Sequence, residues 1–164
     1  MIGYKYNLIM KDCSMNSIVS SLLSNVNVED YYWTILESEV YKKADPVECD
    51  GRYTGKEFKK ALKDLDACYI VRINIQASKK VIDAVKDYED YMNSECELAI
   101  LVTDVAYNDI YCKSREQCEI IKNNCLKLDY NQFEVTDDDN GQVGRLRFPR
   151  IRGRSGRAYL LRRT

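Results

Sequence analysis

The sequence predicts an α+β fold: a mainly antiparallel sheet of roughly five to seven strands, with about three or four helices packed on one face. Short segments in which apolar and polar side chains alternate indicate strands. Between them lie segments whose apolar residues recur at helical spacing behind a Ser, Thr or Asp cap. The most apolar stretch, Cys96–Cys112 (CELAILVTDVAYNDIYC), predicts a buried β-hairpin around which the other elements are arranged.

The chain has 164 residues, which is enough to bury a core without cross-links. We expect one domain over residues 1–148 and an arginine-rich, flexible tail over residues 149–164. No segment reaches the roughly 20 apolar residues that a membrane-spanning helix needs. The start, MIGYKYNLIMKD, lacks the pattern of a secretory signal, so we expect a cytoplasmic protein with no membrane partner.

The first expected elements are a strand, a helix and a second strand. Alternation predicts a strand at Gly3–Met10, and Asp12 or Ser14 could cap a helix that continues to about Asn25. The aromatic and apolar segment Tyr31–Tyr41 (YYWTILESEVY) then predicts a strand.

The middle of the chain predicts a loop, a capped helix and a strand. Asp-Pro and Asp-Gly pairs within Lys42–Tyr53 indicate turns, so we expect a loop there. A helix is expected over about Gly55–Asp64, because Thr54 and Glu57 have the spacing of a capping box. Ala67–Gln76 (ACYIVRINIQ) alternates clearly, which predicts a strand with one solvent-exposed face and one buried face.

Two further capped helices flank the central hairpin. Asp87 is expected to cap a short helix at Tyr88–Asn93 that leads into the hairpin. Ser114 is expected to cap a longer helix at Arg115–Leu128, where Gln117 completes a second capping-box pattern.

The end of the domain predicts another hairpin. Asp137–Gly141 (DDDNG) ends in Asn-Gly, a strong hairpin signal, and joins strands expected at Phe133–Thr136 and Gln142–Phe148. Its acidic run does not have the spacing of a calcium loop, because Arg147 would stand at the twelfth position, where a carboxylate is required.

The chain contains no histidine, which excludes the commonest catalytic triads of hydrolases. It also lacks the residue that most often shuttles protons and binds metal ions. The seven cysteines form no C-x-x-C pair, which argues against zinc. Those among apolar residues are expected to be reduced thiols in the core: Cys68, Cys96, Cys112 and Cys118. No phosphate-binding glycine loop or dinucleotide motif is present. We expect no metal, no cofactor and no enzymatic activity, and an enzyme built on paired carboxylates is the remaining catalytic alternative.

Charge divides the chain into two parts. Residues 1–144 hold 17 bases and all 26 acids, a net charge of −9, whereas eight arginines and no acid follow Gly144. Every lysine precedes Gly144, so the type of base changes there as well. The tail therefore has three interpretations: a nucleic-acid or acidic-surface arm, a vector-encoded or frame-shifted extension, or a segment that docks on the acidic domain.

We expect a non-enzymatic protein-binding module of the kind that neutralises a basic partner such as a nuclease. The candidate partner-binding residues are aromatic and acidic side chains of the second strand and the central hairpin: Tyr32, Trp33, Glu37, Glu39, Asp104 and Asp109. The aromatics would anchor a partner if exposed, and are core residues otherwise. The alternative function is nucleic-acid binding through the tail, with candidate residues Arg150, Arg152, Arg154 and Arg157.

Three stretches of the chain carry a resemblance to known proteins: YYWTI, DYEDYMNSECELAILVTDVAYNDIYCKS and the acidic turn before GRLRF. Over about residues 31–148, the chain resembles a small bacterial family catalogued as a domain of unknown function and found in spore-forming Gram-positive species. The family supplies no activity, cofactor or catalytic residue. The tail after Phe148 departs from the family's usual end, which favours the extension interpretation.

Overall fold

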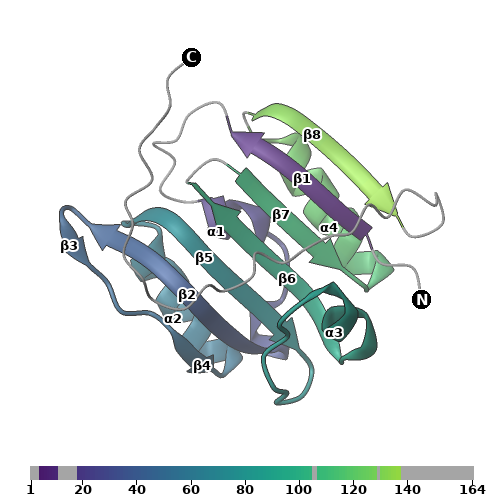
Figure 1. Cartoon of the computed structure of the whole chain (residues 1–164), viewed down its shortest axis with the longest axis horizontal. Coiled ribbons are helices and arrows are strands. Elements are labelled where there is room, and N and C mark those ends of the chain that lie inside the picture. The colour runs from purple at the N-terminus through teal and green to yellow at the C-terminus, as the bar shows by residue number, and fades with distance from the viewer. Residues whose placement is uncertain (1–3, 11–17, 105–106, 129, 138–164) are drawn as a thin grey trace.

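The computed structural model has the α+β fold that the sequence predicts (Figure 1). It describes the backbone of residues 4–10, 18–104, 107–128 and 130–137, and side chains within 18–104 and 107–128. In these parts of the chain, three helices pack on one face of an antiparallel sheet and a fourth packs on the other face. The expected domain end at residue 148 lies outside the described residues and stays a prediction.

The described strands join into one eight-stranded antiparallel sheet with the order β3-β2-β5-β6-β7-β1-β8, and β4 pairs with β2 beside this path. The strands are β1 (Tyr4–Met10), β2 (Tyr32–Lys42), β3 (Asp45–Pro46), β4 (Gly51–Tyr53), β5 (Tyr69–Ser78), β6 (Cys96–Thr103), β7 (Tyr107–Cys112) and β8 (Tyr130–Asp137). Because β6 and β7 pair in the middle of this order, the predicted central hairpin is confirmed.

The helices within the described residues are α1 (Ile18–Leu22), the 3-10 helix η1 (Val28–Asp30), α2 (Gly55–Leu65), α3 (Tyr88–Asn93) and α4 (Arg115–Leu126). In Figure 1, α1, α2 and α4 lie behind the sheet, and α3 lies at one end of it with its preceding loop. The expected capping box of α2 is present, because the Thr54 hydroxyl accepts from the Glu57 amide and the Glu57 carboxylate accepts from the Thr54 amide at 2.7 Å.

The cap of α4 differs from the expected reciprocal box. The Ser114 hydroxyl accepts a hydrogen bond from the Gln117 amide at 3.5 Å, as the pattern predicts. The Gln117 side chain does not turn back to the cap, because its Nε2 donates to the hydroxyl of Tyr31. This helix is therefore joined at its first turn to the segment that precedes β2.

The main core lies between the sheet and α1, α2 and α4. Trp33 of β2 is 1% exposed and stacks on Phe58 of α2, with ring centroids 4.0 Å apart. Its indole Nε1 donates to the carbonyl of Val28 at 2.8 Å, which satisfies the polar atom of a buried ring. Ile100 of β6, near the middle of the sheet, and Ile121 of α4 belong to the same cluster.

A second, smaller core lies on the opposite face, beneath α3 and the loop before it. Tyr91 of α3 packs there with Tyr111 of β7, at a ring separation of 5.7 Å. Gln76 of β5 is only 3% exposed, and its amide group exchanges two 2.8 Å hydrogen bonds with the backbone of Val85. The prediction of one solvent-exposed face for β5 is therefore wrong at this end, because side chain–backbone bonds allow the polar face to be covered.

The segment Lys42–Tyr53 also differs from its prediction as a loop, since it contains the short strands β3 and β4. Both pair with β2 and extend the sheet at its edge. Other predictions fall outside the described residues: the helix caps Asp12 and Ser14, the turn after Asp137, the strand Gln142–Phe148 and the tail.

Candidate functional site

Part of the sheet face opposite α1, α2 and α4 carries exposed or half-buried side chains, and we call it the open sheet face. Val40 and Ile70 pair with each other and point into the main core, so their neighbours Tyr41 and Tyr69 point to the opposite face. The surface comprises Leu36, Glu39, Tyr41, Tyr69, Arg72, Thr103, Tyr107 and Asp109. It therefore combines tyrosines with acidic side chains and one arginine on paired strands.

The tyrosines are the unusual feature of this surface. Tyr107 is 54% exposed and Tyr69 is 43% exposed, although both lie in strands. Tyr32, at 44% exposed, lies on the same face nearer to α3, where it pairs with Ser78. The sequence analysis selected Asp109 as a candidate but neither Tyr107 nor Tyr69. The position of Tyr69 depends on the register between β2 and β5, which shifts twice after Leu36.

Trp33 requires a correction, because the sequence analysis placed it among the partner-binding residues. It is 1% exposed and lies in the main core, on the opposite face from Tyr32. A partner cannot contact this side chain while the domain is folded. Of the two aromatic candidates, only Tyr32 is on the surface.

Glu37 and Glu39 lie where β2 changes its register with β5. Glu37 has a φ of +52°, a left-handed conformation that is uncommon outside glycine, and burial raises the pKa of its carboxyl group despite the nearby Arg72 charge. Two residues of β2 bulge out here, so Glu39 is on the open sheet face, 3.9 Å from the Arg72 guanidinium. The Tyr41 hydroxyl donates to Glu39 at 3.2 Å.

The two aspartates of the hairpin occupy different environments. Asp104 is exposed just after β6 with a φ of +49°, a conformation that Asp tolerates in turns. Asp109 is half-buried within β7 and pairs across to Leu101 of β6. The structure thus brings Glu39 and Asp109 onto one face, with Asp104 at the end of the hairpin. The tail candidates, Arg150 to Arg157, lie outside the described residues.

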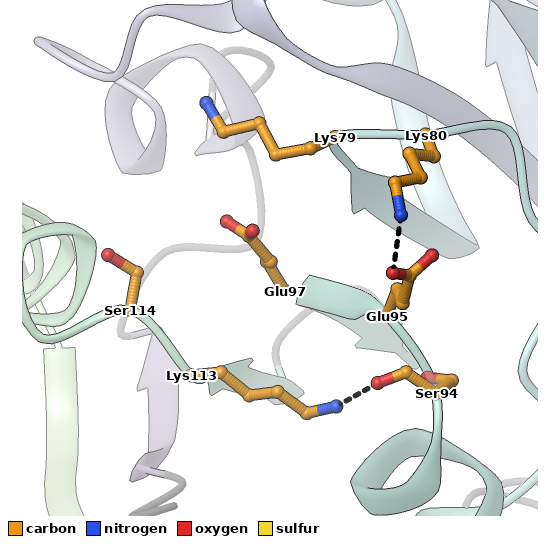
Figure 2. A pocket seen from close by; sticks show the side chains of 7 residues that line it. All are labelled: Lys79, Lys80, Ser94, Glu95, Glu97, Lys113 and Ser114. Carbon is orange, nitrogen blue, oxygen red and sulfur yellow. Dashed lines mark hydrogen bonds and ion pairs between the residues drawn. The ribbon is translucent and has the colours of Figure 1, made fainter.

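A pocket of about 310 Å³ opens elsewhere, at the end of the sheet where β5 and β7 finish and β6 begins (Figure 2). Lysines, glutamates and serines line it: Lys79, Lys80, Ser94, Glu95, Glu97, Lys113 and Ser114. Lys80 and Glu95 form an ion pair of 2.9 Å at its rim. The sequence analysis did not identify this site, because its residues come from the end of β5, the start of β6 and the segment after β7, which only the sheet order brings together.

Lys113 has a structural role in this pocket. Its ammonium donates to the carbonyls of Tyr91, Met92 (3.4 Å) and Ser94 (2.7 Å), which lie at the end of α3. It also lies 4.6 Å from the centre of the Tyr91 ring. Burial lowers the pKa of this lysine. The side chain therefore binds carbonyls at a helix end, a favourable place for a cation.

Lys79 is held on the other side of the pocket by an aromatic ring. Its ammonium lies 3.8 Å from the centre of the Tyr31 ring, within the range of a cation–π contact. Burial opposes its charge, but the hydrogen bond to Tyr31 and the nearby carboxylates raise the pKa of Lys79. Tyr31 is held in turn by Gln117, which is 6% exposed.

The cysteines with described environments are buried and are not joined in disulfides: Cys49, Cys68, Cys96, Cys112, Cys118 and Cys125. The sequence predicted buried thiols for four of them: Cys68, Cys96, Cys112 and Cys118. Within the described residues, no three His, Cys, Asp or Glu side chains gather in a group that could hold a metal ion. The described helices include none of the length and apolarity that crossing a membrane requires.

Comparison with known proteins supports the resemblance seen in the three sequence stretches. The profile of a family described as "Protein of unknown function (DUF2691)" matches residues 9–147, which include both the open sheet face and the pocket. The chain belongs to the DUF2691 family. The predicted resemblance to a family of unknown function is thereby confirmed, over a longer range than the sequence stretches indicated.

The chain is also similar to an individual bacterial protein. This chain is similar to the uncharacterised protein YncE of Bacillus subtilis (strain 168), with 31% identity over 88 residues. The match covers 52% of this chain and 57% of the length of YncE. No solved structure matches the chain.

Proposed function

We propose that this DUF2691 protein is a non-enzymatic protein-binding module that recognises a basic protein through the open sheet face. The observation that supports this most is the exposure of Tyr69 and Tyr107 on the same strand face as Glu39 and Asp109. Tyrosine is enriched in protein interfaces, because it buries a large ring and still satisfies its hydroxyl group.

The secondary structure adds a second argument. Side chains on paired strands are held at fixed spacings, so a partner meets a surface that loses little conformational entropy on binding. The acidic Glu39, Asp104 and Asp109 lie on or beside this surface. Their charges favour a basic partner and would increase the association rate more than the affinity.

The test is affinity capture with the full chain from lysate of the source organism, with and without nuclease treatment. The test variant combines Tyr69→Ser with Tyr107→Ser, and the control is Leu126→Ser, which changes a 51% exposed apolar residue on α4. We expect the wild type and the control to retain one basic protein. We expect the double variant to retain at least about tenfold less, since two interface tyrosines are removed.

Two results would contradict the proposal. One is equal capture by the wild type and the double variant, because the open sheet face would then make no contribution. The other is capture that disappears after nuclease treatment, because binding would then pass through nucleic acid, as the tail alternative predicts.

A further inference from the structure

The pocket between the ends of β5, β6 and β7 is separate from the open sheet face, and its charged groups are not all paired. Lys80 is paired with Glu95, and Lys113 donates to three carbonyls at the end of α3. Glu97 differs from these groups. Its carboxylate makes no hydrogen bond or ion pair within 4 Å to another described residue, although it lies among three lysines.

The backbone of Glu97 is held in place. Its carbonyl accepts hydrogen bonds from the Lys113 amide at 2.9 Å and from the Tyr91 hydroxyl at 3.3 Å. Figure 2 shows its side chain pointing into the space between Lys79 and Ser114. A carboxylate that extends from this fixed backbone into a pocket, without a described partner, can accept hydrogen bonds from a ligand.

Donors for an anionic group lie opposite this carboxylate. The Lys79 ammonium is positioned over the Tyr31 ring, 3.8 Å from its centre, and has N–H groups that can donate to a ligand. The Ser114 hydroxyl accepts from the Gln117 amide, and its hydrogen has no acceptor among the described residues. Lysine and serine side chains are common ligands of carboxylate groups.

The charges select the class of ligand. A simple anion would be repelled by Glu97, and a simple cation would be repelled by Lys79 and Lys113. A molecule with an ammonium and a carboxylate a few ångströms apart matches both sides. A volume of about 310 Å³ is at the small end of ligand pockets, which suits a single amino acid.

We propose that this pocket binds a free α-amino acid, with its ammonium on Glu97 and its carboxylate on Lys79 and Ser114. The site lies away from Tyr69 and Tyr107, so it does not depend on the proposed protein-binding function.

The test is a nuclear magnetic resonance titration of the isotope-labelled full chain with each of the twenty common L-amino acids. We expect at least one of them to shift the amide signals of Glu97, Lys113 and Ser114 in a saturable manner. The carboxamide of that amino acid, which lacks the carboxylate, and its N-acetyl derivative, which lacks the ammonium, should each bind at least about tenfold more weakly.

Matched variants separate the pocket from the general charge of the surface. Glu97→Gln and Lys79→Gln should each weaken binding by at least about tenfold, because each leaves one ligand charge unpaired. Lys86→Gln, which changes an exposed lysine outside the pocket, should bind as the wild type does. The proposal is wrong if none of the twenty amino acids shifts these signals, if either derivative binds as well as its parent, or if Glu97→Gln has no effect.

Discussion

Tyr32 and Trp33 are neighbours in the chain with opposite environments. Tyr32 is 44% exposed and lies on the same side of the sheet as the open sheet face. Trp33 is 1% exposed and lies in the main core on the other side. The alternation of a strand explains this difference, because successive side chains point to opposite faces. Composition marks both residues as interface anchors, but only the position of the helices decides which of them is on the surface.

This difference predicts unequal effects of truncation. Trp33→Ala should lower the free energy of unfolding by about 4 kcal/mol, because it removes the stacking on Phe58 and leaves a cavity. Tyr32→Ala should lower it by about 0.5 kcal/mol, as expected for an exposed side chain. Urea unfolding measures both values. Equal losses would show that the assignment of the two faces is wrong.

The buried thiols predict how stability depends on pH. Burial raises the pKa of the Cys125 thiol to about 12 and that of the Cys96 thiol to about 11, from an ordinary value of 9.0. Above pH 9 the unfolded chain loses these protons while the folded chain keeps them, so the free energy of unfolding falls as pH rises. Below about pH 8 both states hold the protons, and these thiols cause no dependence.

Cys125→Ala tests this dependence. Between pH 9 and pH 10.5, the free energy of unfolding of the variant should fall less steeply than that of the wild type, by about 1 kcal/mol per pH unit. Urea unfolding at a series of pH values gives both slopes, and the slopes below pH 8 serve as the internal control. Identical slopes in the alkaline range would mean that Cys125 ionises as readily in the folded chain as in the unfolded one.

At the scale of elements, the first turn of α2 is in close contact with η1. A Cβ atom on Gly55 would lie 2.4 Å from the Cα of Glu29 and 2.5 Å from its carbonyl oxygen. The Lys59 ammonium also pairs with the Glu29 carboxylate at 2.7 Å. The absence of a side chain at Gly55 is therefore what allows the two elements to approach.

Gly55→Ala separates helix propensity from packing. Propensity alone predicts a gain of up to about 1 kcal/mol in stability, because Ala is the better helix former. The backbone contact instead predicts a loss of about 2 kcal/mol, since η1 must move. Thermal or urea unfolding decides the sign, and Lys56→Ala, on the exposed side of the same turn, should change stability by less than about 0.5 kcal/mol. An increase in stability for Gly55→Ala would contradict the described contact.

The elements that the sequence predicted correctly depend on local signals. The Thr54 cap with Glu57, the Asp87 cap of α3 and the apolar run of the central hairpin all act within a few residues. The errors involve contacts between distant segments. Gln76 is buried because Val85 bonds its amide group, and Gln117 bonds Tyr31 instead of its own helix end.

At the scale of the whole molecule, the sheet carries two candidate sites, the pocket and the open sheet face, in different places. The pocket collects residues from the ends of β5, β6 and β7 near α3, and the open sheet face lies farther along the same strands. Neither could be predicted in full from the sequence. The acidic and aromatic candidates were visible in the chain, but the partners Tyr69 and Arg72 depend on a register that two irregularities in β2 and β5 set.

The most direct test of the protein-binding proposal is site-specific photo-crosslinking in the source organism. A benzophenone amino acid replaces Tyr107 on the open sheet face or, as the control, Leu126 on α4, and both positions are more than half exposed. We predict that the probe at position 107 links covalently to one basic protein and that the probe at position 126 does not. Crosslinks to the same proteins from both positions, or none from position 107, would contradict the proposal that the open sheet face binds a partner.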